Sequence, residues 1–117
     1  HALEAKTGYG ETLSHGESVA IGTVMAFDLS VRMGLCPTDD RDRIKNHLTG
    51  CGLPVGLDGI RDDGWSASEL INLMGQDKKV TGGKLTFILA RGIGQSFITD
   101  DVDLADVTAV LDNHLTP

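Results

Sequence analysis

The fold follows from one stretch of the sequence, Ser14-His15-Gly16-Glu17-Ser18-Val19-Ala20-Ile21-Gly22. Apolar residues dominate from position 19 to position 33, and a helix that is apolar on nearly all sides is normally buried among other helices. We therefore predict a central helix from about Glu17 to Met33, which Gly34 ends. His15 directly precedes this helix, so we expect its side chain to stand at the mouth of a rigid element, where a ligand can be held.

Shorter patterns on both sides predict a mainly α-helical single domain over residues 1–117, with one small β-hairpin as its only sheet. Helical spacing of apolar residues predicts further helices over residues 1–6, 39–49, 66–75 and from 103 onwards. Residues 85–90 and 95–99 have the composition of strands, and glycines between them bend the chain.

Several polar side chains are expected to act within or beside these helices. Residues 66–69 match a capping box, and Asp39 or Asp40 is expected to cap the helix that follows the central one. Asp28 and Arg32 lie four positions apart, which predicts an ion pair worth about 0.2–0.5 kcal/mol on the thin polar stripe of the central helix.

Composition limits the function classes. A net charge of −7 argues against broad binding to nucleic acid or to an anionic membrane, and no run of the sequence is long enough to span a bilayer. Cys36 and Cys51 lack the spacing of a metal finger, so we expect reduced thiols in a cytoplasmic protein, although the residues alone leave a bridge open.

His15 is the strongest candidate for chemistry because a neutral imidazole is the commonest metal ligand in proteins. Glu17 is close enough in sequence to accept a hydrogen bond from the ring and orient it. The alternative is that His15 only caps the helix. His47 and His114 fall in amphipathic surface helices, and we predict that both are structural or solvated.

A second candidate is the lysine pair in Asp77-Lys78-Lys79, which lies beside the glycine turn at residues 82–83. Two ammonium groups in an acidic protein can form an anion site. The alternative is a solvated loop.

An ordered set of motifs across nearly the whole chain resembles the 3-dehydroquinate synthases. The set consists of His1-Ala2-Leu3-Glu4-Ala5, Gly8-Tyr9-Gly10, Leu13 to Gly22, Leu29-Ser30, Gly34-Leu35, Gly52-Leu53-Pro54, Asp77-Lys78-Lys79, Leu85 to Leu89 and Gly92-Ile93-Gly94. The chain also starts at His1 with the pattern of a helix already under way, so we expect a segment of a longer protein.

The resemblance implies most of the helical C-terminal domain of a two-domain cytoplasmic enzyme, which is a homodimer. Family members convert 3-deoxy-arabino-heptulosonate 7-phosphate to 3-dehydroquinate and phosphate, with bound NAD and a divalent metal, zinc or cobalt. NAD belongs mainly to an N-terminal domain that we expect to be absent here, so the segment alone should be inactive.

Three residues carry the family roles in this sequence. The resemblance implies that His15 is a metal ligand, that His1 is a catalytic group transferring protons near the phosphate, and that Lys78 contacts the substrate phosphate. All three are thus expected at the substrate. The remaining ligands and the NAD-binding glycines have no counterpart in this chain.

Other readings stay open at this level. A related sugar-phosphate cyclase such as 2-deoxy-scyllo-inosose synthase shares the metal and NAD chemistry, and a metal-dependent alcohol or glycerol dehydrogenase shares the fold. A non-catalytic helical interaction module is the alternative from a different class.

Overall fold

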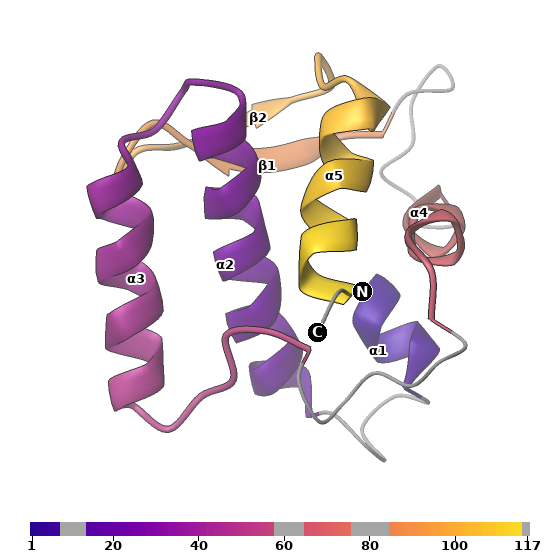
Figure 1. Cartoon of the computed structure of the whole chain (residues 1–117), viewed down its shortest axis with the longest axis horizontal. Helices are drawn as coiled ribbons and strands as arrows, with labels where there is room; N and C mark the ends of the chain where they lie inside the picture. The colour runs from indigo at the N-terminus through magenta and orange to yellow at the C-terminus, as the bar shows by residue number, and fades with distance from the viewer. Residues whose placement is uncertain (8–13, 58–64, 76–84, 116–117) are drawn as a thin grey trace.

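The computed structural model describes residues 1–7, 14–57, 65–75 and 85–115. Within these ranges the chain forms five helices and one hairpin, in agreement with the predicted mainly helical fold (Figure 1). The elements are α1 (Ala2–Lys6), α2 (His15–Arg32), α3 (Thr38–Gly50), α4 (Ala67–Gly75), β1 (Phe87–Ala90), β2 (Ser96–Thr99) and α5 (Leu104–Leu115). None of the described helices is long and apolar enough to cross a membrane.

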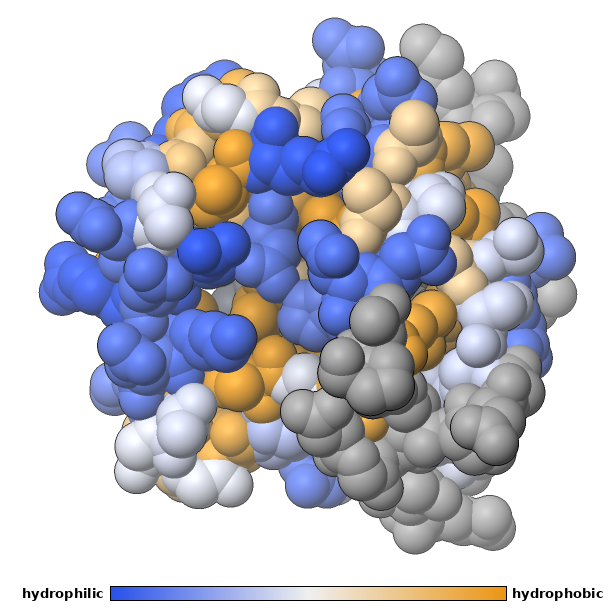
Figure 2. Space-filling model, in the orientation of Figure 1, coloured by the Kyte–Doolittle hydropathy of each residue, from blue (hydrophilic) through white to orange (hydrophobic). Residues whose placement is uncertain are grey.

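Helix α2 is the central element, as its apolar sequence predicts. It contacts α1, α3, α5 and β1, while α4 lies against α1 and α5. In Figure 1 the helices α3, α2 and α5 stand side by side, and the hairpin lies near the C-terminal end of α2. Figure 2 shows hydrophilic side chains gathered on the side of the molecule that α3 forms. Accordingly, α3 has no fully buried residue.

The main hydrophobic core lies between α2, α4, α5 and β1. Its buried members are Leu3, Ile21, Leu29, Leu57, Ala67, Leu70, Leu89, Val107, Val110 and Leu111. The predicted inward faces of α4 and α5 are therefore confirmed. Because α1 contributes a buried leucine, this short helix is held to the rest of the domain by apolar contact rather than by its own helix propensity.

Local signals define both ends of α2. Ser14 and Glu17 form a reciprocal capping box, so the helix begins at His15, two residues before the predicted start. Gly34 has a φ of +74° at the other end, a conformation that favours glycine. The Gly34 N–H donates to the Val31 carbonyl and the Leu35 N–H donates to the Ser30 carbonyl, so both carbonyls of the last helical turn are bonded.

The predicted hairpin is confirmed, with β1 and β2 antiparallel and Ile88 opposite Ile98. Asp40 links the turn of this hairpin to α3, because its Oδ2 accepts a hydrogen bond from the Ile93 N–H at 3.1 Å. The prediction that Asp39 or Asp40 caps α3 is therefore wrong. Pro37 occupies the N-cap position, and no side chain caps the helix there.

The predicted ion pair between Asp28 and Arg32 is also wrong, because both side chains pair with residues of other helices. Arg32 Nε lies 2.9 Å from Oδ1 of Asp106 on α5, and the Asp28 carboxylate binds Arg41 and His114. A salt bridge within one exposed helix contributes little. Each of these contacts joins α2 to a neighbouring helix instead.

Candidate functional site

His15 is the first residue of α2, and its ring is largely exposed. Its side chain is 74% accessible to solvent, and its Nδ1 lies 3.1 Å from Oε1 of Glu4 on α1. The carboxylate is much more enclosed, with 17% of the side chain exposed. One edge of the imidazole is therefore bound to the protein, which leaves Nε2 as the nitrogen available to a ligand.

The predicted role of Glu17 as the acceptor for the His15 ring is wrong. Oε1 of Glu17 accepts a hydrogen bond from the Ser14 N–H at 3.0 Å, and the Ser14 hydroxyl accepts from the Glu17 N–H at 3.2 Å. Hydrogen bonds from the Ser14 backbone and side chain lower the pKa of Glu17 below its ordinary value of 4.5. The Glu17 carboxylate therefore belongs to the capping box, and the carboxylate that contacts the His15 ring is that of Glu4.

Sequence reasoning missed Glu4 because the contact joins two helices. Residues 4 and 15 are eleven positions apart, and they belong to different helices, α1 and α2. The available signal was an acidic residue within the first predicted helix. Its contact with His15 depends on how α1 packs against α2, which periodicity alone does not specify.

His1 directly precedes α1 and lines an apolar cavity of about 600 Å³. Ser18 and Gly22 from the first half of α2 line the same cavity, together with residues of α4, α5 and the hairpin. His15 does not line the described part of this cavity. The structure thus places His1 beside a cavity and His15 at the start of α2, with both side chains exposed.

The donor set around His15 fits one ligand of a metal site. Within the described parts of the chain, no group of three or more His, Cys, Asp or Glu side chains is arranged to hold a metal ion. A single imidazole oriented by a carboxylate is, however, the usual form of a histidine ligand. His15 and Glu4 therefore fit a metal whose remaining ligands come from elsewhere.

Lys78, the predicted phosphate contact, lies outside the described residues, and so does the whole Asp77-Lys78-Lys79 motif. The structure does not test this prediction.

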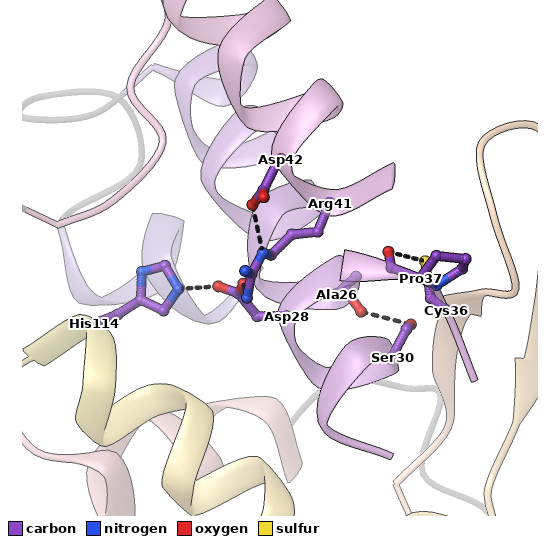
Figure 3. Close-up of polar contacts among 8 residues, drawn as sticks. All are labelled: Ala26, Asp28, Ser30, Cys36, Pro37, Arg41, Asp42 and His114. Carbon is purple, nitrogen blue, oxygen red and sulfur yellow. Dashed lines mark hydrogen bonds and ion pairs between the residues drawn. The ribbon is translucent and has the colours of Figure 1, made fainter. Parts of the chain in front are cut away.

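His114 has a structural role, in line with the prediction, but it is enclosed rather than on the surface. Its side chain is 11% exposed, and Nε2 lies 2.7 Å from Oδ2 of Asp28. Arg41 Nη1 lies 3.3 Å from the other oxygen of the same carboxylate. Figure 3 shows Asp28 between the side chains of α5 and α3. This carboxylate therefore connects three helices.

Both cysteines are free thiols, as predicted. Cys36 is buried, and this burial, with a smaller contribution from the nearby charge of Asp40, raises the pKa of its thiol above 9.0. Cys51 is exposed, and its Sγ lies 3.8 Å from Nε2 of His47, which is also exposed.

Comparisons with known proteins agree with the motifs. The family model described as 3-dehydroquinate synthase C-terminal matches residues 1–80. The 3-dehydroquinate synthase of Roseobacter denitrificans is 54% identical over 115 residues, which cover 98% of this chain and 31% of that protein. The protein of the same name from Rhodospirillum rubrum is 52% identical over 120 residues, 100% of this chain and 31% of the relative. The one from Caulobacter vibrioides is 50% identical over 111 residues, 95% of this chain and 30% of the relative.

The chain thus spans about a third of the length of the curated relatives it matches, 31% for the first of them. The family match includes all three residues that the motifs single out, His1, His15 and Lys78. Together with the helical fold and its single hairpin, these matches establish that the chain belongs to the 3-dehydroquinate synthase family.

Proposed function

We propose that this chain forms the metal- and phosphate-binding part of a 3-dehydroquinate synthase. The reaction converts 3-deoxy-arabino-heptulosonate 7-phosphate to 3-dehydroquinate with loss of phosphate, a carbon–oxygen lyase step of the shikimate pathway to aromatic amino acids. The proposal is carried by the family-model match over residues 1–80, which includes His1, His15 and Lys78. Relatives of that name that are 50–54% identical to this chain support it.

Each of the three residues has a separate task in this proposal. His15 offers Nε2 as one metal ligand, because its Nδ1 is engaged by Glu4. The Lys78 ammonium makes charge-assisted hydrogen bonds to the substrate phosphate and stabilises its charge as it departs. The imidazole of His1 exchanges a proton close to the phosphate.

When bound, the divalent metal, zinc or cobalt, polarises substrate oxygens and NAD carries the redox chemistry. We place NAD mainly in an N-terminal domain outside this chain. On this basis the 117-residue chain is inactive by itself, and the complete enzyme is a cytoplasmic homodimer.

A chimera tests the proposal directly. This chain would replace the matching 115 residues of the Roseobacter denitrificans relative, and the formation of 3-dehydroquinate and phosphate would be measured beside the unmodified relative. We expect an active chimera and no activity from the 117-residue chain alone. A folded chimera that binds NAD and zinc but forms no 3-dehydroquinate would overturn the proposal.

Three variants of the chimera then test the roles of His15 and Lys78. His15→Ala should reduce zinc content and turnover together, since one ligand is lost. Lys78→Ala should weaken the binding of a phosphonate substrate analogue at least about tenfold, or about 1.4 kcal/mol. Lys79→Ala is its matched control. Equal losses at the two lysines would indicate a diffuse electrostatic patch rather than one phosphate contact.

A further inference from the structure

We propose that Glu4 is the positioning residue for His15: its carboxylate holds the proton on Nδ1 and directs Nε2 outwards as the ligand atom. The inference rests on the proposed metal-binding function. The distance of 3.1 Å between Oε1 and Nδ1 is within hydrogen-bonding range. An ionised carboxylate has no hydrogen to donate, so the ring nitrogen must be the donor. In the neutral ring this leaves the lone pair on Nε2.

Glu4 is well placed for this task because α1 is anchored on both sides. Leu3 is 7% exposed and belongs to the main core, so the residue next to Glu4 is fixed by packing. Lys6 Nζ lies 2.6 Å from Oε1 of Glu69 on α4, and the same ammonium lies 5.8 Å from the centre of the Trp65 ring. These contacts hold α1 against α4, and with it the carboxylate that His15 meets.

The two partners differ strongly in exposure, and the difference indicates which one orients the other. Glu4 is mostly enclosed, whereas the ring of His15 is mostly exposed. His15 is the first residue of α2 and is exposed. Among the described contacts of its ring, only the one with Glu4 selects the ring orientation. The carboxylate of Glu17, although closer in sequence, is occupied by the backbone and hydroxyl of Ser14.

The first test measures the tautomer of His15. The chain would be labelled with ¹⁵N-histidine, and long-range ¹H–¹⁵N correlations would be recorded at about pH 8, where an ordinary histidine is neutral. His15→Gln identifies the signals. We expect Nδ1 to be the protonated nitrogen in the unmodified chain. In Glu4→Ala the ring should return to the preference of free histidine for a proton on Nε2, and Glu4→Gln should fall between.

Glu17→Ala is the matched control, because it removes a carboxylate at the start of α2 that does not touch the ring. It should weaken the helix cap but leave the tautomer unchanged. An unmodified chain with the free-histidine tautomer, or a shift in Glu17→Ala as large as that in Glu4→Ala, would overturn the role of Glu4. Circular dichroism of each variant verifies that the helices are retained.

A cobalt titration provides the second readout. The same substitutions are placed in the chimera with the Roseobacter denitrificans relative, because a single imidazole is not a complete metal site. Paramagnetic changes in the His15 signals should require roughly tenfold more cobalt in Glu4→Ala, the lower end of the 10–100-fold range for groups that orient metal ligands. Equal midpoints in the two proteins would contradict the positioning role. If the tautomer depends on Glu4 but cobalt leaves His15 unchanged in every variant of the chimera, the proposed metal function fails while the role of Glu4 in fixing the ring stands.

Discussion

Replacing Ser30 by alanine tests how the central helix holds the hairpin. Ser30 is fully buried, with 0% of its surface exposed. Its hydroxyl donates to the Ala26 carbonyl at 2.7 Å within α2, which Figure 3 shows, and accepts from the Ala90 N–H of β1 at 3.0 Å. The Ser30→Ala variant removes that acceptor and leaves the Ala90 N–H buried without a partner.

The expected loss follows from these two contacts. A buried donor left without a partner costs about 1–3 kcal/mol. Alanine recovers up to about 0.5 kcal/mol because its helix propensity is higher than that of serine. We therefore expect the free energy of unfolding to fall by about 1.5 kcal/mol. With a urea dependence of about 1.5 kcal/mol per molar, the midpoint of urea unfolding should fall by about 1 M.

Thr23→Ala is a suitable control on the same helix. The Thr23 hydroxyl also donates to the carbonyl four residues earlier, that of Val19, at 2.7 Å. Within the described part of the chain this hydroxyl makes no hydrogen bond to the hairpin, so the substitution should leave stability nearly unchanged. Both variants would be followed by circular dichroism in urea and by amide hydrogen exchange at Ala90.

Hydrogen exchange provides the more specific readout, because Ala90 should lose protection in Ser30→Ala before the core amides of α2 do. The reasoning is refuted if Ser30→Ala and Thr23→Ala lower stability equally. It is also refuted if the Ala90 amide keeps its full protection from exchange in the Ser30→Ala variant.

Three further predictions concern charge and thiol chemistry. Asp28→Asn should lower the free energy of unfolding by about 1–2 kcal/mol in urea titrations, because a charged acceptor between three helices is lost and the site is partly shielded from solvent. The pKa of Glu17 is lowered in the folded chain, so its contribution to stability is present above pH 4.5 and is lost as the pH falls through the folded pKa, which thermal unfolding at a series of pH values would follow. Iodoacetamide should modify exposed Cys51 much faster than Cys36, whose thiol is buried and has a raised pKa, as mass spectrometry of timed samples would record.

For each of these three predictions, one experimental result would contradict the reasoning. An Asp28→Asn variant as stable as the unmodified chain would mean that the carboxylate is not needed to join the helices. For the acid transition, Glu17→Gln should lose less stability between pH 5 and about pH 3 than the unmodified chain, and identical profiles would remove Glu17 as the cause. Modification of Cys36 and Cys51 at equal rates in the folded chain would contradict the burial of Cys36.

The candidate site was predictable in part, and the difference between Glu17 and Glu4 shows why. His15 stands out because a histidine and a glycine come just before a long apolar run, which is a pattern within one stretch of sequence. The residue that contacts its ring comes from another helix, while the nearer carboxylate satisfies the N–H groups at the helix start. A prediction that uses sequence proximity alone therefore selects the wrong glutamate.

The sequence by itself determined the central helix, its glycine end, the apolar faces of α4 and α5, and the hairpin. These depend on side-chain periodicity and on backbone preferences that act over a few residues. Only the tertiary structure decided that Glu4 meets His15, that Arg32 pairs with Asp106 and that Asp28 joins α3 to α5. Burial of the apolar faces sets which helices become neighbours, and the polar side chains then pair across those contacts with partners that are distant in sequence.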